Sequence, residues 1–229
     1  MGMMKINRYL DAAILKPETT RKETIAAINE CLKYKTMTAC VRPCDIELAK
    51  SMCKGTDTFV CCVLNFPHGN DSSDAKQAEA ELYVKKGVVE IDMVANFALA
   101  KSAEWKLYEE DIRVVSSVTK KAGIVLKVIF ETCYLSIDEI RLCTKAAIAA
   151  EADFVKTSTG FGTGGATDEA VRAMLETADG KIKVKPSGGI RDYARAKSFI
   201  DMGCHRLGVN FSSVAAICDG GKADGTDSY

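Results

Sequence analysis

The stretch "FVKTSTGFGTGGATDEAVRAMLETA", residues 154–178, places a lysine at the end of a short apolar run and follows it with hydroxyls and glycines. From Val171 to Ala178, apolar side chains recur at the i, i+3, i+4, i+7 spacing of a helix face. Thr167 is suited to cap that helix, and the two acidic residues after it suit the first helical turn. The stretch therefore predicts a strand, a glycine-rich turn and an amphipathic helix.

The same unit repeats along the 229 residues. Eight short apolar runs alternate with helical patterns, without a linker or a change of composition between them. The runs expected as strands are residues 12–15, 38–41, 59–64, 89–94, 124–130, 153–157, 182–185 and 206–209. Strands that alternate with helices predict a parallel sheet covered by helices.

Eight is the strand number of a closed (β/α)8 or TIM barrel, and the chain length fits that fold. We therefore expect a single-domain α/β barrel over residues 1–218. An open doubly wound sheet is the alternative, because the first run is short and weakly apolar. The last segment, residues 219–229, is rich in glycine and aspartate and is expected to be a flexible tail.

The charge balance narrows the class of partner. Lys plus Arg and Asp plus Glu both number 31, so the formal net charge is zero. Because no basic block stands out, we expect neither a nucleic acid nor an anionic membrane as a partner. The N-terminus lacks the apolar region of a signal peptide, and no run of about 18 apolar residues could span a bilayer. We expect a cytoplasmic protein.

The ten cysteines do not follow a metal-binding pattern. No Cys-x-x-Cys pair occurs, and His68 and His205 have no ligand spacing around them. We therefore expect free, mostly buried thiols of a reducing compartment and no metal site.

Three ionisable residues lie in runs that are expected to be buried. Lys156 and Lys185 end consecutive predicted strands, each just before a glycine turn, and Asp92 lies within another strand. In a parallel barrel the functional residues gather at the carboxyl ends of the strands. An unpaired buried ion costs several kcal/mol, so a lysine alone would favour the solvent side of an edge strand. Three such residues together favour a shared site.

Two lysines and a carboxylate suit Schiff-base chemistry. A lysine with a pKa near 10.4 is only about 0.04% neutral at pH 7. A second ammonium and partial burial can lower that pKa by about three units, which makes the amine a nucleophile toward carbonyls. The protonated imine is an electron sink that requires no metal, so we expect no cofactor. Asp92 is the carboxylate available to move protons.

The glycines after the seventh and eighth predicted strands suit a phosphate. In "PSGG" at residues 186–189, the N–H groups of Gly188 and Gly189 would point into the site, ahead of a helix that begins near Asp192. Barrels often bind phosphate in these two loops, here residues 187–190 and 208–211. The substrate expected is a small phosphorylated aldehyde or another phosphorylated carbonyl compound.

A dinucleotide motif is the alternative for the loop after Lys156. Gly160, Gly162 and Gly165 spell G-x-G-x-x-G between a strand and a helix. That motif requires an acidic residue about 20 positions further on, where this chain has "GKIKVKPSG". Nicotinamide binding is therefore not expected.

With these residues in place, the chain resembles the deoxyribose-phosphate aldolases, which are class I aldolases on a TIM barrel. The resemblance covers most of the chain, from "LDAAILKPETT" to "HRLGVNFSS". Its more specific segments are "EIDMVAN", "KVIFETCYLS", "DFVKTSTGFGTGGAT" and "KPSGGIRD". The family cleaves 2-deoxyribose 5-phosphate reversibly to acetaldehyde and glyceraldehyde 3-phosphate, and the resemblance implies that reaction here.

The resemblance also implies residue roles. Lys156 is expected to form the Schiff base, Lys185 to lower its pKa and handle protons, and Asp92 to donate and accept protons. The expected phosphate and substrate contacts are Asp11, Cys40, Thr157, Gly160, Ser187, Gly188, Gly189, Gly208, Val209 and Asn210. Tyr229, the last residue, is expected to act as a further catalytic group if the tail folds over the barrel mouth. A homodimer is the oligomeric state that we consider for this chain.

The chain departs from the family pattern at a few positions. Ala12 and Ala13 replace polar residues that are expected near the sugar, and Val209 and Asn210 replace a pair of small hydroxyl residues. Gly162 stands where serine is common. Two other functions remain as alternatives: a Schiff-base enzyme for a different phosphorylated carbonyl compound, and a catalytically silent binding barrel.

Overall fold

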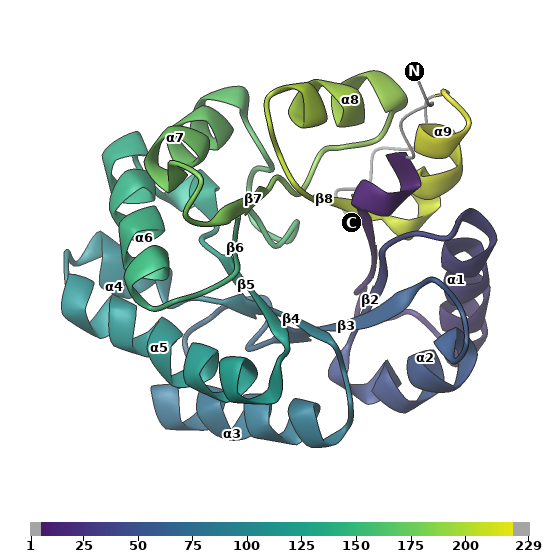
Figure 1. The fold of residues 1–229 in the computed structure, drawn as a ribbon, viewed down its shortest axis with the longest axis horizontal. Helices are drawn as coiled ribbons and strands as arrows, with labels where there is room; N and C mark the ends of the chain where they lie inside the picture. Colours follow the sequence, from purple (N-terminus) through teal and green to yellow (C-terminus); the bar gives the residue numbers. More distant parts are fainter. Residues whose placement is uncertain (1–5, 222–229) are drawn as a thin grey trace.

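The computed structural model describes residues 6–221, in which eight parallel strands form a ring and the helices lie around its outside (Figure 1). The strands are β1 (Leu10–Ile14), β2 (Thr38–Val41), β3 (Phe59–Leu64), β4 (Glu90–Val94), β5 (Val125–Ile129), β6 (Phe154–Lys156), β7 (Lys183–Lys185) and β8 (Leu207–Asn210). The carboxyl ends of parallel strands in a barrel meet at one face, which positions the candidate site.

The helices follow the strands in chain order. The α-helices are α1 (Arg21–Tyr34), α2 (Ile46–Cys53), α3 (Ser73–Lys85), α4 (Phe97–Lys101), α5 (Trp105–Ala122), α6 (Ile137–Ala149), α7 (Asp168–Ala178), α8 (Tyr193–Asp201) and α9 (Val214–Cys218). Short 3-10 helices are η1 (Ile6–Tyr9), η2 (Pro43–Asp45), η3 (Thr132–Tyr134) and η4 (Phe211–Ser213).

The strand order confirms the closed barrel. The order is β7-β6-β5-β4-β3-β2-β1-β8, so each strand lies beside its neighbour in sequence and β1 pairs with β8. Between β7 and β8, an isolated bridge joins Ser187 to Gly208, and the Gly208 N–H donates to the Pro186 carbonyl at 2.9 Å. A doubly wound sheet would reverse its strand order, and this sheet does not.

The strand boundaries agree closely with those expected, and the largest difference is at the start of β1. The sequence predicts a strand from residue 12, whereas β1 begins at Leu10 and includes Asp11. Asp11 is buried there because Thr38 Oγ1 and Arg206 Nη1 both donate to its Oδ1, each at 2.7 Å. The sequence pattern identifies strands by their apolar residues, so it does not reveal that a charged residue belongs to a strand when its partner is distant in the sequence.

Helix starts are set by local side chains. Thr167 caps α7 as predicted, because its side chain accepts from the N–H of Ala170. At α1 the Thr20 side chain and Glu23 form a capping box. Such caps satisfy N–H groups that have no partner within the helix.

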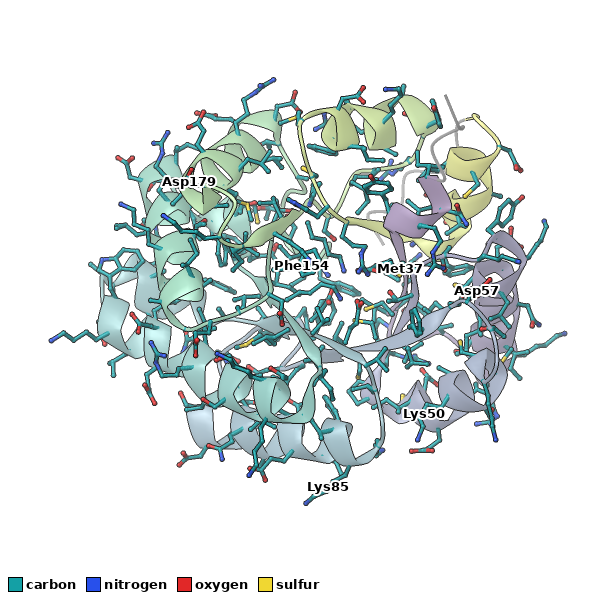
Figure 2. All side chains as sticks on the ribbon, in the orientation of Figure 1. Met37, Lys50, Asp57, Lys85, Phe154 and Asp179 are labelled. Carbon is teal, nitrogen blue, oxygen red and sulfur yellow. The ribbon has the colours of Figure 1, made fainter. Side chains whose placement is uncertain are left out.

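Two groups of apolar side chains lie on opposite faces of the strands, because neighbouring strand residues point to opposite sides. The larger core lies between the strands and the helices and includes Leu10, Ala12 and Ile14. The smaller group lies inside the barrel, where Figure 2 also places Phe154 near the centre. It consists of Ala13, Leu15, Cys40, Cys61 and Val63, with Phe66 packed against them.

All ten cysteines lie within residues 6–221 and are free, as predicted. Seven are buried, and Cys44 is exposed. Among the helices of these residues, none is both long enough and apolar enough to cross a membrane.

A buried ion pair connects two helices to the end of β4. The Lys76 Nζ donates to Asp111 Oδ2 at 2.7 Å and to the carbonyls of Gly69 and Val94 at 2.8 and 3.1 Å. Asp111 also accepts from the Asn96 N–H at 3.0 Å. Because both charged side chains are buried, each depends on the other for its neutralisation.

We expect Asp111→Ala to lower the free energy of unfolding by about 3–5 kcal/mol, because Lys76 would remain buried without its anion. Urea unfolding measures this change. The control is Glu110→Ala, an exposed neighbour on the same helix, with an expected change within about 0.5 kcal/mol. Equal effects of the two substitutions would contradict a stabilising role for the pair.

Candidate active site

The Asp92 carboxylate is the point at which the predicted residues meet. Lys156 Nζ lies 2.9 Å from Asp92 Oδ2, and Lys185 Nζ lies 2.7 Å from the same oxygen. The three side chains come from β6, β7 and β4, and all three are buried. The two ammonium nitrogens can therefore be no farther apart than the sum of these two distances.

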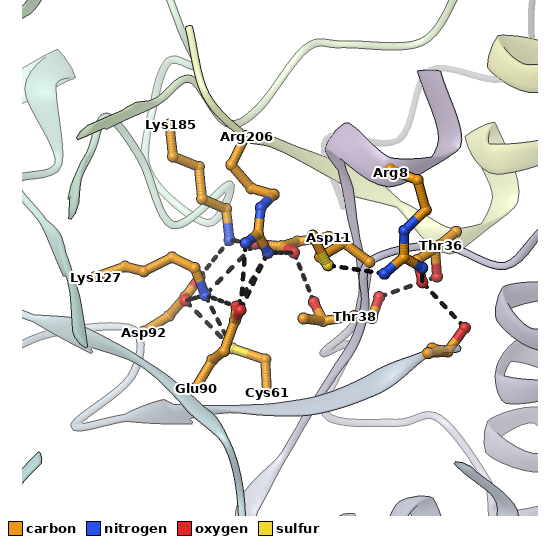
Figure 3. A network of polar contacts seen from close by, with 12 residues as sticks. Arg8, Asp11, Thr36, Thr38, Cys61, Glu90, Asp92, Lys127, Lys185 and Arg206 are labelled. Carbon is orange, nitrogen blue, oxygen red and sulfur yellow. Dashed lines mark hydrogen bonds and ion pairs between the residues drawn. The ribbon is translucent and has the colours of Figure 1, made fainter. Parts of the chain in front are cut away.

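A third lysine approaches Asp92 from the other oxygen (Figure 3). Lys127 Nζ, from β5, donates to Asp92 Oδ1 at 2.9 Å, contacts Glu90 and lies 3.5 Å from Asp11 Oδ2. The Cys61 thiol also donates to Asp92 Oδ1, at 3.2 Å. Asp92 is therefore surrounded by donors on both of its oxygens.

Further ion pairs connect this centre to β1 and to the start of β8. Lys185 Nζ lies 2.6 Å from Asp11 Oδ2, and Arg206 Nη1 contacts Asp11 Oδ1 at 2.7 Å and Glu90 Oε2 at 3.1 Å. Seven side chains form this network, which we call the charge cluster. They are Asp11, Glu90, Asp92, Lys127, Lys156, Lys185 and Arg206.

The cluster fixes the ionisation of several of its members. Burial raises the pKa of Asp92, but Lys127, Lys156 and Lys185 outweigh it and hold that pKa well below its ordinary value. Burial likewise opposes ionisation of Asp11, and Lys185, Lys127 and Arg206 together lower its pKa. For Lys127 burial lowers the pKa, whereas Asp92, Cys61, Glu90 and Asp11 raise it well above the ordinary value. The two aspartates are therefore carboxylates, and Lys127 is an ammonium ion.

The sequence interpretation did not identify Lys127, Glu90 or Arg206. Lys127 lies in the apolar run "IVLKVIF", so the argument used for Lys156 and Lys185 applies to it equally. Glu90 lies two positions before Asp92 and therefore points to the same face of β4. Arg206 immediately precedes β8, where the sequence pattern offers no comparable signal.

The predicted phosphate-binding residues lie at the seam between β7 and β8. Ser187 and Gly208 form the bridge of that seam, and Gly188 and Gly189 have φ angles of 84° and 78°. The helix α8 begins at Tyr193 and is capped by Asp192, close to the expected start. These loops therefore lie beside the strand that carries Lys185.

Two residues predicted to contact the substrate have side chains with other roles. Val209 packs in the outer core, so only its backbone faces the site. The Asn210 side chain accepts from the Ser212 N–H at 3.0 Å and caps the 3-10 helix η4. The same alternation corrects the expectation for Ala12, which lies in the outer core, whereas Ala13 lies inside the barrel.

Thr157 and Gly160 lie in the loop that follows Lys156. The Thr157 Oγ1 donates to the Ser187 carbonyl at 3.1 Å and accepts from the Ser187 N–H at 3.0 Å. Further along, a Cβ on Gly165 would lie 2.5 Å from the Gly188 carbonyl oxygen. The last glycine of the G-x-G-x-x-G pattern therefore has a packing role, because it lets this loop approach the next one.

Cys40 lies inside the barrel, where its sulfur, that of Cys61 and a carboxylate oxygen of Asp92 all lie within 4.8 Å of one another. This is a possible set of metal ligands by distance. The ammonium groups of Lys127, Lys156 and Lys185 already surround the carboxylate, so the site is poorly suited to a cation. Tyr229 and residues 222–228 lie outside the described residues.

This chain is similar over most of its length to a known family of aldolases. Residues 5–205 match the family model described as DeoC/LacD family aldolase. A deoxyribose-phosphate aldolase of an Exiguobacterium species is 43% identical over 222 residues, which cover 96% of this chain and 99% of the relative.

Two solved structures have the same fold. The aldolase QR15 superposes with a TM-score of 0.88 at 37% identity, over 95% of this chain and 96% of that one. The tetrameric deoxyribose phosphate aldolase of Aeropyrum pernix gives a TM-score of 0.83 at 26% identity, over 93% and 89% of the two chains.

The depressed pKa values of Asp92 and Asp11 predict how stability depends on pH. Below the ordinary aspartate pKa of about 4, the unfolded chain binds protons that the folded carboxylates do not bind. The free energy of unfolding should therefore decrease as the pH falls from about 5 to 3. Lys127→Met removes one cause of the depression, so that decrease should become shallower, by up to about 1 kcal/mol per pH unit.

Urea unfolding at several pH values measures this slope, which is separate from any overall loss of stability in the variant. Lys145→Met, at an exposed lysine on α6, is the control and should keep the original slope. Identical slopes in all three proteins would contradict the assigned electrostatic role of Lys127.

Proposed function

The chain belongs to the DeoC/LacD family of aldolases, and on that premise we propose that it cleaves 2-deoxy-D-ribose 5-phosphate reversibly to acetaldehyde and D-glyceraldehyde 3-phosphate. The observation that carries this proposal is the pair Lys156 and Lys185 on one buried carboxylate oxygen of Asp92. A nucleophilic amine, a second amine and a proton-transfer group are the parts that a class I aldolase needs.

Lys156 is the nucleophile of the proposed reaction. Its neutral amine adds to the C1 aldehyde of the open-chain sugar, and loss of water gives the protonated imine. The imine then accepts the electron pair of the C2–C3 bond, which leaves an enamine on the lysine and releases glyceraldehyde 3-phosphate. Protonation of C2 and hydrolysis of the imine release acetaldehyde and restore Lys156.

Asp92 and Lys185 move the protons in this scheme. As C2–C3 breaks, the proton of the C3 hydroxyl must leave, and Asp92 is held as a carboxylate that can accept it. Lys185 contacts the Asp92 oxygen that also binds Lys156, so it is placed to exchange that proton. Its second contact, with Asp11, keeps it oriented toward the two groups.

The phosphate group is assigned to the seam between β7 and β8. Gly188, Gly189 and Gly208 would allow a phosphate to approach the backbone closely, and Ser187 and Asn210 border the same loops. Asp11, Cys40, Thr157 and Gly160 complete the proposed substrate contacts. Tyr229 remains a candidate for proton transfer to C2.

The cellular setting forms part of the same proposal. The reaction would consume deoxyribose phosphate released in deoxyribonucleoside breakdown, in the cytoplasm, whose reducing conditions suit the ten free cysteines. We also propose that the chain self-associates, with a homodimer as the expected assembly; the Aeropyrum pernix relative is described as a tetramer.

We expect borohydride to trap a covalent adduct of deoxyribose 5-phosphate on Lys156, which mass spectrometry of the digested protein would locate. Lys156→Arg should abolish both the adduct and turnover, because a guanidinium stays charged and cannot condense with an aldehyde. The control is Lys181→Arg, at an exposed lysine, and it should keep wild-type turnover.

The same experiment distinguishes the alternatives. Trapping of other phosphorylated carbonyl compounds but not of deoxyribose 5-phosphate would indicate a different Schiff-base enzyme. A failure to trap any of them would indicate a silent binding barrel. Near-normal turnover in Lys156→Arg would contradict the Schiff-base mechanism itself.

We expect Asp92→Asn to lower kcat by about 10²–10⁴-fold, because an amide cannot accept the hydroxyl proton. Steady-state kinetics per folded molecule measures this loss. Glu90→Gln is the matched control: it also removes a negative charge from the cluster but keeps the Asp92 contacts of Lys156 and Lys185, so its kcat should fall far less. Equal losses in the two variants would reduce Asp92 to an electrostatic role.

A further inference from the structure

Glu131 is a buried acidic residue that the proposed mechanism does not use. It lies two residues after the end of β5, is 2% exposed, and has a φ angle of 56°. This left-handed conformation is uncommon for residues other than glycine, which would adopt it without strain. Six non-glycine residues among residues 6–221 have a positive φ angle, and Glu131 is the buried one among them, which directs attention to the contacts of its side chain.

The Glu131 carboxylate binds the loop that follows Lys156. The N–H of Thr159 donates to Glu131 Oε1 at 3.2 Å and lies 3.4 Å from Oε2, and the Thr159 hydroxyl donates to Oε2. Thr159 is itself fully buried. Burial raises the pKa of Glu131, and the hydrogen bonds from Thr159 oppose that rise. The charge of Lys156 also opposes the rise, but the pKa stays above its ordinary value. The nitrogen and oxygen donors to this buried carboxyl group both come from Thr159, and the Cys133 thiol lies 4.0 Å from Oε1.

The contact extends further into the loop. The Thr159 Oγ1 accepts from the N–H of Phe161 at 3.0 Å. A Cβ on Gly162 would lie 3.0 Å from both the Glu131 carboxyl carbon and the Cys133 sulfur. The loop therefore packs closely on the Glu131 and Cys133 side chains.

The two sides of the loop are held differently. On the β7 side, Thr157 is hydrogen-bonded to Ser187, and the Ala166 N–H donates to the Gly188 carbonyl at 3.2 Å. On the β5 side, the last backbone bond runs from the Thr132 N–H to the Thr157 carbonyl at 2.9 Å. After that bond, the loop that follows β6 is connected to the segment that follows β5 by the hydrogen bonds of Thr159 with the Glu131 side chain.

We propose that Glu131 is a positioning residue, whose carboxylate holds residues 157–162 in the conformation that binds substrate. The segment begins directly after Lys156 and includes Thr157 and Gly160, two of the proposed substrate contacts. The inference rests on the proposed function for its kinetic consequence, whereas its structural consequence can be measured without substrate. Glu131 holds the loop through Thr159, and its charge also acts on Lys156. Because Glu131→Ala and Glu131→Gln both remove that charge, the comparison of the two variants isolates the hydrogen bonds.

The first test compares two substitutions of Glu131 in steady-state kinetics with deoxyribose 5-phosphate. Glu131→Ala should raise KM about tenfold and change kcat by less than about threefold, because Lys156 and Asp92 keep their own contacts. Glu131→Gln keeps a side-chain oxygen that can accept from Thr159, so its KM should stay within about twofold of the wild type.

A second variant tests the other partner in the contact. Thr159→Val removes the hydroxyl but keeps the N–H, and it should raise KM in the same direction as Glu131→Ala. The matched control is Thr144→Val, which removes an equally buried hydroxyl from α6 and should leave KM unchanged. If Glu131→Ala does not fold, Thr159→Val still decides the result, because an unchanged KM in that variant would overturn the proposal.

Hydrogen–deuterium exchange of the free proteins provides the readout that does not need turnover. The amides of residues 159–162 should exchange at least about tenfold faster in Glu131→Ala than in the wild type, and close to the wild-type rate in Glu131→Gln. Unchanged exchange rates in Glu131→Ala, or equally increased exchange rates in Glu131→Ala and Glu131→Gln, would overturn the role of the hydrogen bonds. A wild type that forms no adduct with deoxyribose 5-phosphate would instead refute the proposed function, and the exchange rates would still decide the inference.

Discussion

The interaction on which the site depends is the sharing of one buried carboxylate, Asp92, by three lysines of consecutive strands. Lys127, Lys156 and Lys185 come from β5, β6 and β7, and the pairing of these strands with one another and with β4 brings the three side chains to the same carboxylate. Each of these ions alone would cost several kcal/mol to bury. The ions are retained because the parallel register aligns Lys156 with Lys185 and Asp92 with Lys127. The register of the strands therefore determines which side chains meet at the candidate site.

The charge cluster also has an electrostatic imbalance that bears on catalysis. Four cationic and three anionic side chains carry one net positive charge when all are ionised. The carboxyl group of Glu131 interacts electrostatically with Lys156 and therefore belongs to the same charge balance. A class I aldolase needs one neutral amine among its lysines. The proposed Schiff-base reaction therefore requires that one amine of this network be neutral.

The sequence was sufficient for the parts of this arrangement that follow strand ends. Lys156, Lys185 and Asp92 could be assigned because each interrupts an apolar run of a strand, and the run count gave the barrel. Lys127 interrupts an apolar run in the same way, and Glu90 lies two positions before Asp92, so both were within reach of the same argument. The ion pairs of Arg206 with Asp11 and Glu90 join distant strands, which local patterns do not contain. The same limit explains the error at Ala12: the side of the strand on which a residue lies depends on the position of β1 in the barrel, and its buried Asp11 concealed where that strand begins.

The two edges of the loop after Lys156 are held in place by different kinds of contact. At β7 the loop is held by close approach of backbones, which requires glycine at positions 165 and 188, because a side chain there would meet main-chain atoms. At β5 it is held by a carboxylate that a residue in a left-handed conformation places under the loop. The contact at β7 is between main chains, whereas the contact at β5 passes through a buried side chain. The loop after Lys156 is therefore held by backbone packing at one edge and by side-chain hydrogen bonds at the other.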